Sequence, residues 1–314
     1  MSVTTVSAAL SGSGRMGAQT RQRVAAAAAG LGYSPSPSAR HLRTARTGTI
    51  GLCLPDQVLA LEYYMHLAFG AAEAAMSQGL SLTLVPAQSS RKTLAAMPVD
   101  GMIVVDPVQD DATIAALVDA GFPIVTCEDD PSGALHSGAV TGDHRYGAKE
   151  LLEHLAGEGA RSIAMIAPPA TSSWSAAVRS EYQQFCRARD APDLLVSVPF
   201  VSTISTVRTA THEILDHPGV DAIVAMPDGG AAGALQAATA RGYRVPLDLL
   251  IAAGVDSTLM ELSAPPITAL DLNPRQMGAE AAVMLGAALD GRLQENRAIV
   301  PVVLRQRAST LRTS

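Results

Sequence analysis

From residue 48 onward, short runs of apolar residues alternate with longer segments in which apolar residues recur every three or four positions. The short runs are typical of strands buried on both faces of a parallel sheet, and the longer segments have helical spacing. The alternation forms two series of similar length, at about 48–140 and 141–270, and the second starts near AVTGD. A strand at ITALDLN, a long helix at NPRQMGAEAAVMLGAALDG and one last strand at AIVPVVLRQRAST follow. The pattern predicts an α/β fold with two doubly wound parallel sheets, one in each of two lobes.

Two lobes of this kind predict a cleft between them, because ligands of parallel sheets bind outside the carboxyl ends of the strands. The first 47 residues do not follow the alternation. They contain a segment with helical spacing, AQTRQRVAAAAAGLG, and then the proline-containing link GYSPSPSARHLRTARTG. Two prolines in this link disfavour a helix before Ser38, and SARHLRTA is too short to be a stable helix without a partner.

Charge divides the chain in the same place as the hydrophobic pattern. Residues 1–47 carry six arginines and no acidic residue, whereas the rest of the chain carries 17 cationic and 29 acidic residues. A basic segment attached to an acidic body is typical of a small nucleic-acid-binding head. The alternative is a solvated basic tail, which the helical periodicity and the capping residues of the segment disfavour.

A glycine run in the basic segment, LSGSGRMG, has the spacing G-x-G-x-x-G at Gly12, Gly14 and Gly17. A dinucleotide site needs a strand before such a run and an acidic residue about 20 positions after it. The residues before it have helical rather than strand spacing, and no acidic residue occurs before Asp56. The run therefore indicates a connection between two helices.

The remaining motifs give no indication of catalysis or of a bound cofactor. His212 and His217 are five positions apart and so do not share a helix face, which disfavours joint metal ligation. We expect the seven histidines to be ordinary surface residues and Cys53, Cys127 and Cys186 to be buried free thiols. We expect no enzyme activity, no cofactor and no metal. Because no apolar run has transmembrane length and the N-terminus does not resemble a signal peptide, we expect no membrane association and a cytoplasmic location.

Residues 3–56 resemble the head, hinge and first strand of the lac repressor family of bacterial transcription regulators. The matching residues are Thr5-Val6-Ser7, Leu10, Gly12, Thr20-Arg21, Arg23-Val24, Ala27, Gly32-Tyr33, Pro35, Ala39-Arg40, Leu42-Arg43 and Ile50-Gly51. The resemblance continues through VDGMIVV, GARSIAMIAPP, AGVDS and VVLRQRASTL. It implies a partial helix-turn-helix head (1–34), a hinge helix and linker (35–47), and a core like a periplasmic sugar-binding protein (48–314). The expected N-lobe comprises about 48–140 and 272–299, and the expected C-lobe about 141–271 and 300–314.

The resemblance also implies roles for residues of the head. Ser2 to Ser11 matches the recognition helix, which lies in the major groove, with Val3, Thr4 and Ala8 at base-reading positions. Phosphate contacts are implied for Ser2, Ser7, Ser11, Arg15, Thr20 and Tyr33. Ala39, Arg40 and Leu42 match the hinge helix, in which the leucine wedges into the minor groove of the operator; a core leucine is the alternative.

Positions that hold a small-molecule effector in the family correspond to Glu128, Arg179 and Asp256. Asp228 lies beside a family asparagine position that is Pro227 here, and another polar family position is Leu270. These two departures remove hydrogen-bonding side chains and weaken the expectation of a sugar. Trp174, in a predicted loop, either stacks on the ligand or packs under that loop. For Glu128 and Asp228 a surface ion pair is the alternative, whereas Arg179 and Asp256 have the better motif match.

The sequence thus predicts a ligand-responsive repressor whose partners are a palindromic operator DNA, a sugar or related polar effector, and a second copy in a homodimer. The alternative is a solute-binding protein of the periplasmic type without DNA-binding function. Met1 stands where the family has a valine just before the recognition helix. We therefore expect the native start to lie upstream and to add the first helix of the helix-turn-helix; a truncated regulator is the alternative.

Overall fold

The computed structural model describes residues 6, 17–31, 46–55, 61–86, 91–109, 112–133 and 136–312. These residues belong to two compact units, Met1–Gly48 and Thr49–Ser314. In the first unit, helix α2 (Ala18–Gly30) confirms the helix expected in this segment. The carbonyl of Gly17 accepts the first two helical bonds, from the backbone N–H groups of Thr20 and Arg21, both at 3.1 Å. The predicted recognition helix and hinge helix lie outside the described residues, apart from helical Val6.

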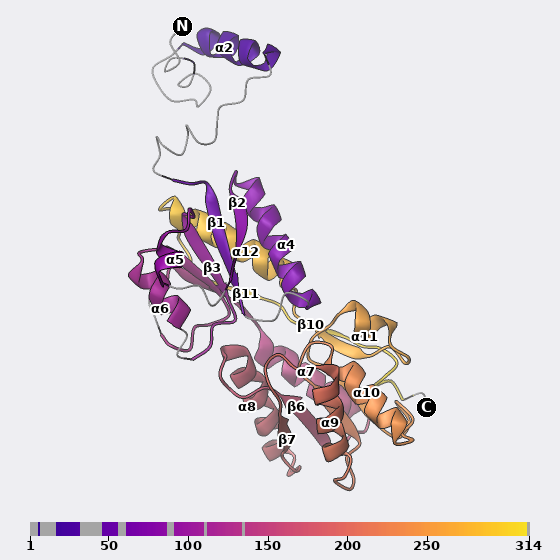
Figure 1. Cartoon of the computed structure of the whole chain (residues 1–314). Coiled ribbons are helices and arrows are strands. Elements are labelled where there is room, and N and C mark those ends of the chain that lie inside the picture. The colour runs from indigo at the N-terminus through magenta and orange to yellow at the C-terminus, as the bar shows by residue number, and fades with distance from the viewer. Residues whose placement is uncertain are drawn as a thin grey trace. The chain divides into compact units, whose positions relative to one another are not determined.

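The second unit contains two six-stranded sheets, which confirms the predicted fold class (Figure 1). We call the first sheet and its helices the N-lobe. Its strands, in spatial order, are β11 (Arg297–Val300), β5 (Gly138–Gly142), β4 (Ile124–Cys127), β3 (Gly101–Val105), β1 (Thr49–Leu54) and β2 (Ser81–Pro86). All neighbouring strands of this sheet are parallel. Its helices are α4 (Glu62–Ser77), α5 (Arg91–Ala95), α6 (Ala112–Asp119) and α12 (Pro274–Leu289).

The second sheet and its helices form the C-lobe. Its strands, in spatial order, are β12 (Val303–Arg305), β10 (Thr268–Asp271), β9 (Leu250–Ala253), β8 (Ala222–Ala225), β6 (Ile163–Ala167) and β7 (Leu194–Ser197). Only the pair β10–β12 is antiparallel among these strands. Its helices are α7 (His144–Gly157), α8 (Ser173–Ala188), α9 (Ile204–Ile214), α10 (Gly230–Ala240) and α11 (Thr258–Leu262).

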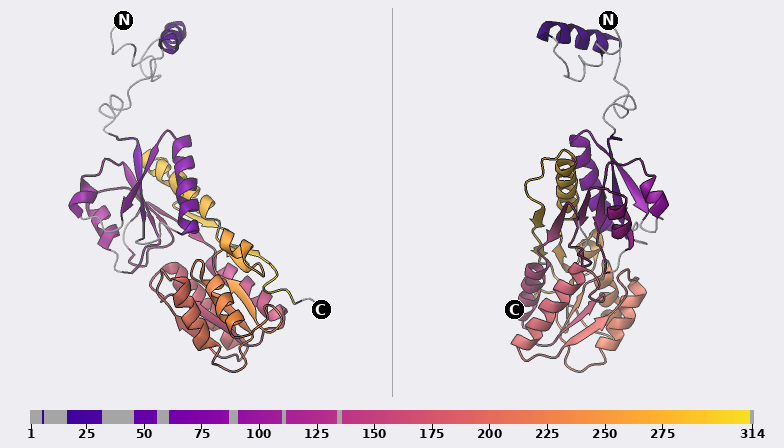
Figure 2. Two further views of the ribbon diagram at one scale, coloured as in Figure 1. Left: turned by 45° about the vertical axis from the view of Figure 1, so that its right-hand side comes forward. Right: turned by 90° about the vertical axis from the view of Figure 1, so that its left-hand side faces the viewer.

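Each sheet has helices on both faces (Figure 2). In the N-lobe, Leu52 and Leu54 share a core with α4 and α12, whereas Cys53 between them joins Leu94 of α5 and Ile114 of α6 on the other face. This alternation follows from the period of two in a strand. Because both faces are covered, the strands read as continuous apolar runs in the sequence.

The chain crosses between the lobes three times within residues 136–312. The crossings follow β5, β10 and β11, and they are joined by hydrogen bonds from Asp143 N to Val300 O (3.0 Å) and from Asn273 Nδ2 to Pro301 O (2.8 Å). Two strand predictions need correction here. The strand at AVTGD belongs to the first sheet rather than opening the second series, because β5 pairs with β4 and β11. The single strand predicted at AIVPVVLRQRAST is two strands in different sheets, because Pro301, which has no N–H, separates β11 from β12.

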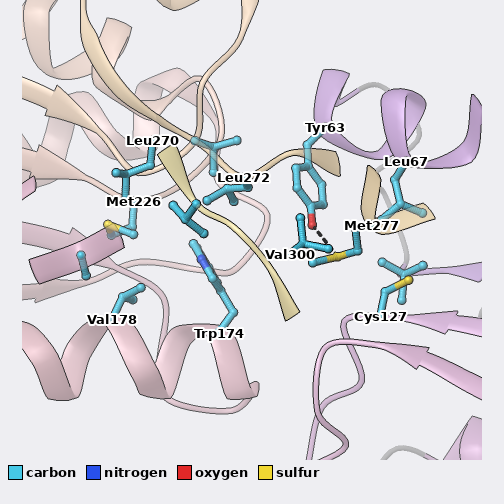
Figure 3. Close-up of a cluster of buried hydrophobic side chains, with 14 of the residues drawn as sticks. Tyr63, Leu67, Cys127, Trp174, Val178, Met226, Leu270, Leu272, Met277 and Val300 are labelled. Atoms are coloured by element: carbon cyan, nitrogen blue, oxygen red, sulfur yellow. Dashed lines mark hydrogen bonds between the residues drawn. The ribbon is translucent and has the colours of Figure 1, made fainter. Parts of the chain in front are cut away.

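A continuous apolar core runs past these crossings. Leu272 lies between Trp174 of the C-lobe and Tyr63 of the N-lobe, and the Tyr63 hydroxyl donates to Met277 Sδ at 3.4 Å (Figure 3). The three cysteines are buried and free, as predicted. No helix in the described ranges is long and apolar enough to span a membrane.

Candidate functional site: a pocket between the lobes

A pocket with about 460 Å³ of empty space, part of it open to solvent, lies where strands of both sheets end. The strand order reverses between β1 and β3 in the N-lobe and between β6 and β8 in the C-lobe. Ligands of parallel sheets bind at such reversals. The pocket is lined by Leu61, Tyr63, Tyr64, Asp106, Glu128, His144, Trp174, Phe200, Pro227, Asp228, Val255 and Leu272.

Two carboxylates on the N-lobe side come from equivalent positions of neighbouring strands. Asp106 and Glu128 directly follow β3 and β4, whose last residues, Val105 and Cys127, lie opposite each other. Both have left-handed backbone conformations, with φ of 48° for Asp106 and 78° for Glu128. A non-glycine residue in this region carries about 1–3 kcal/mol of strain, and such residues cluster at functional sites. The left-handed residue ends each strand, and both side chains line the pocket.

Hydrogen bonds from neighbouring elements hold these carboxylates in place. The hydroxyl of Tyr64 on α4 donates to Asp106 Oδ2 at 2.7 Å. Glu128 Oε1 accepts the Gly142 N–H at 3.2 Å and lies 2.7 Å from Nε2 of His144, the first residue of α7. Because Glu128 and His144 are both almost fully buried, their contact is shielded from water and joins the N-lobe sheet to a C-lobe helix.

Burial disfavours the ionised form of two pocket carboxyl groups. Burial raises the pKa of Asp106 to about 7, and the nearby charge of Glu128 adds to this increase. Burial likewise raises the pKa of Asp228 to about 6. Perturbed carboxyl groups that meet in a pocket are typical of functional sites.

The C-lobe side of the pocket is aromatic. Trp174 lies in the first turn of α8 rather than in the predicted loop, because Ser172 and Ser175 form a capping box that starts the helix at Ser173. The indole packs edge to face with Phe200, with ring centroids 5.9 Å apart. Trp174 is 8% exposed and lines the pocket, so the structure places it both in the core and at the candidate site.

Asp228 follows β8 and connects the pocket to the other lobe. Its carboxylate accepts the backbone N–H of Tyr63, one of the unpaired N–H groups in the first turn of α4. The buried atoms Asp228 Oδ2, Trp174 Nε1 and His144 Nδ1 have no hydrogen-bond partner within the described part of the chain. Buried polar atoms normally have partners, so these three are available for hydrogen bonds to a polar molecule in the pocket.

Of the five predicted effector residues, the structure brings Glu128, Trp174 and Asp228 together and places the other two outside this lining. Arg179 donates to the carbonyls of Ala167 (3.4 Å) and Pro168 (3.0 Å) and to Ser197 Oγ (3.1 Å). Asp256 forms a two-bond ion pair with Arg307 at 2.7 and 2.8 Å, in a separate surface depression.

Leu270 is also not part of the lining. Its side chain is buried in the core, so the missing polar group at this position does not change the pocket. Leu272, two residues later, lines the pocket instead, whereas Pro227 does lie there as expected.

Sequence reasoning missed Tyr63, Tyr64, Asp106, His144 and Phe200. The prediction that all histidines are ordinary surface residues is wrong for His144, which is 5% exposed and lines the pocket. A signal for Asp106 was present, because it follows the apolar run GMIVV just as Glu128 follows IVTC. No comparable local signal marked the others, because the tertiary fold brings them to the pocket.

The predicted DNA-binding residues lie outside the described residues, with the exception of Thr20 in α2. Those not described are Ser2, Val3, Thr4, Ser7, Ala8, Ser11, Arg15, Tyr33, Ala39, Arg40 and Leu42.

Comparison with known proteins identifies the family. Residues 1–36 match the model of bacterial regulatory proteins of the lacI family, and residues 152–310 match a periplasmic binding protein-like domain. The HTH-type transcriptional regulator CelR of Thermobifida fusca is 30% identical over an aligned length of 305, and the match covers 93% of this chain and 89% of CelR. The chain belongs to the lacI family of bacterial regulatory proteins. The HTH-type transcriptional regulator DegA of Bacillus subtilis is 28% identical over 100% of this chain and 96% of DegA.

Solved structures agree with this assignment of the lacI-family chain. A CelR–cellobiose complex has a TM-score of 0.78 and 27% identity, and the match covers 96% of this chain and 94% of that one. A lac repressor dimer bound to operator has the same fold, with a TM-score of 0.82 at 22% identity over 99% and 96% of the two chains. The relatives named here are transcriptional regulators, so DNA binding and transcription regulation are the activities of the family to which this chain belongs.

Proposed function

We propose that this lacI-family regulator is a repressor that binds a near-palindromic operator as a homodimer and senses a small polar metabolite, such as a sugar, in the pocket between its lobes. The observation that supports the sensing role is the pocket itself. It takes side chains from both sheets and contains buried polar atoms without partners. The basic residues 1–47 and the lacI-family match of residues 1–36 support the DNA-binding role.

The proposed mechanism is thermodynamic linkage between the pocket and DNA. A ligand that binds both sides of the pocket favours the closed arrangement of the lobes. Closure changes the geometry of the dimer and the order of the hinge helix, which changes operator affinity. Base reading by Val3, Thr4 and Ala8, and insertion of Leu42 into the minor groove, remain part of this proposal.

The surface of α4 supports the proposed dimer. Met65, Phe69 and Met76 are exposed, at 48%, 53% and 75%, although they are large apolar residues. Their spacing of four and seven positions puts them on one face of the helix. A run of exposed apolar residues on one face is typical of a protein–protein interface.

Binding of the full-length protein to palindromic DNA from its own promoter region tests the proposal. Fluorescence anisotropy at several salt concentrations should show an affinity that falls steeply with salt, and a Leu42→Ala variant should lose the preference for the palindrome over scrambled DNA. Cellobiose and ribose are the first effector probes, because relatives are named for them. An equal affinity for palindromic and scrambled DNA would instead support the solute-binding alternative.

A further inference from the structure

The charge of the pocket lining is strongly one-sided. Asp106, Glu128 and Asp228 contribute three carboxyl groups, and His144 contributes one imidazole, which is paired with Glu128. None of the described lining residues is Lys or Arg. One imidazole cannot balance three carboxylates, so an anionic ligand would be repelled and a cationic one attracted.

The arginine expected to hold the effector does not supply the missing positive charge. The Arg179 guanidinium is engaged by two backbone carbonyls at the end of β6 and by Ser197 Oγ on β7. The described arginine next to Asp256 is Arg307, and its guanidinium forms two bonds with that carboxylate outside the pocket. Among the described residues, neither arginine therefore pairs with a carboxyl group of the pocket.

Protein donors in the described part of the chain do not use all the acceptor sites of the carboxyl groups. The buried Asp228 Oδ2 has no partner in the described part of the chain. Asp106 receives one side-chain hydrogen bond, from Tyr64. A carboxylate offers about four acceptor sites, so both groups retain acceptor sites for a ligand N–H.

Aromatic rings line the pocket next to the carboxyl groups. Trp174 and Phe200 lie on the C-lobe side, and Tyr63 and Tyr64 lie on the N-lobe side, with their ring centroids 5.0 Å apart. Aromatic faces next to carboxylates are the usual environment for a bound ammonium group, which gains both charge pairing and cation–π attraction.

We propose that the effector carries a protonated amine on a small cyclic body, with the amine bound among Asp106, Glu128 and Asp228 and the ring against Trp174. This inference rests on the proposed function, because it assigns the chemical class of the effector sensed in the same pocket. An amino sugar has both the protonated amine and the cyclic body. Phosphorylated and carboxylated metabolites are excluded because their negative charge would face the three carboxyl groups. The raised pKa values of Asp106 and Asp228 agree with this assignment, because an ammonium group is the partner that would restore their ionised forms.

The emission of Trp174 gives a local signal for the test, because it is the only tryptophan in the sequence. The full-length protein is titrated with glucosamine, glucose, N-acetylglucosamine and glucose 6-phosphate, and separately with benzylamine and benzyl alcohol. We expect each amine to change the emission at a concentration at least about tenfold lower than its neutral counterpart. Glucose 6-phosphate should have no effect.

Variants test whether the preference for amines depends on the carboxylates of the pocket. Asp228→Asn and Asp106→Asn keep the shape of the side chain and should abolish the preference for the amine. Glu150→Gln removes the same charge from an exposed position on α7 and should leave the preference unchanged. Neutral or anionic probes that bind as well as the amines, or amines without effect at millimolar concentration, would overturn the proposal.

Operator binding by the same preparations separates this inference from the proposed function. Retained operator binding without an amine preference contradicts the effector class alone. If the wild-type protein binds palindromic and scrambled DNA equally well, the proposed function is contradicted, whatever the pocket binds.

Discussion

At the scale of single residues, two acidic positions decide the character of the pocket. Asp106 and Glu128 have similar places in the sequence, each directly after a buried strand, and both have positive φ. Both follow a short apolar run in the sequence, and yet sequence reasoning selected Glu128 and missed Asp106. The difference in their surroundings comes from Tyr64 and His144, which are distant in the sequence and form the contacts that fix each carboxylate.

Replacement of Asp106 by Asn should change the pH dependence of stability. The pKa of about 7 in the folded protein lies above the ordinary value of 3.8, so the folded state retains a proton that the unfolded chain releases. The wild-type protein therefore loses stability as the pH rises from about 4 to 7. Because Asn stays neutral, Asp106→Asn should gain stability relative to wild type across this window, by up to about 4 kcal/mol. Urea denaturation at pH 4.5 and pH 8 measures the difference.

Asp248→Asn is the matched control for this experiment. Asp248 is exposed, and hydrogen bonds from Arg244 lower its pKa to about 2. Its contribution is lost only as the pH falls from about 4 to 2, so Asp248→Asn should lose the same small amount of stability at pH 4.5 and at pH 8. A stability difference for Asp106→Asn that does not vary with pH would contradict the assigned pKa.

At the scale of elements, helices α4 and α12 pack so closely that two glycines make backbone contact. A Cβ atom at Gly70 would overlap the Arg275 carbonyl oxygen, and one at Gly278 would overlap the Leu67 carbonyl oxygen. These helices are separated by almost 200 residues, so the reason for the glycines is invisible in the local sequence. The helices themselves were predictable from their periodicity, but their partner was not.

Gly278→Ala should therefore destabilise the protein, against the intrinsic preference of a helix for alanine. Helix propensity alone would stabilise the variant by about 1 kcal/mol. The overlap with backbone atoms, which cannot move aside as a side chain can, should cost about 1–3 kcal/mol or more. Thermal unfolding followed by circular dichroism measures the net effect.

Gly157→Ala at the end of α7 provides the comparison, because a Cβ atom there meets nothing within 4 Å. We expect this variant to be neutral or slightly more stable than wild type. Equal effects of the two substitutions would show that α4 and α12 do not pack as described.

At the scale of the whole unit Thr49–Ser314, polar contacts at the first turn of α4 join the two lobes beside the pocket. Glu62 accepts the backbone N–H of Thr258 at 3.0 Å and its hydroxyl at 2.9 Å, and Thr258 opens helix α11 of the C-lobe. Next to it, the Tyr63 N–H binds Asp228 of the C-lobe. Two carboxylates on opposite sides of the interface, Glu62 and Asp228, thus accept hydrogen bonds from the other lobe.

Loss of the Glu62 contact should favour separation of the lobes without unfolding either one. Glu62→Ala removes both bonds to Thr258, and a contact of this kind contributes about 1 kcal/mol, or about fivefold in the closed population. Small-angle X-ray scattering should give a larger radius of gyration for the ligand-free variant than for wild type, and effector affinity should fall. Glu150→Gln should change neither quantity, and an unchanged radius for Glu62→Ala would contradict a role of Glu62 in closure.

The sequence by itself determined the fold class, the positions of most helices and strands, the buried free cysteines and the family. Those features depend on local periodicity and on ordered matches along the chain, both of which can be read without a structure. Glu128 could be named from its family position at the end of a strand, Asp228 because it lies next to a polar family position, and Trp174 because it is the only tryptophan in the sequence.

The tertiary structure alone decided which side chains form the pocket. Strand pairing assigned β5 to the first sheet and separated β11 from β12, which set the three crossings between the lobes. The crossing after β5 brings His144 to Glu128, and packing of α4 brings Tyr64 to Asp106, while Arg179 and Asp256 bind other partners. The physical reason is that the charge and shape of a pocket are sums over residues far apart in sequence, and only their packing shows which charges face one another.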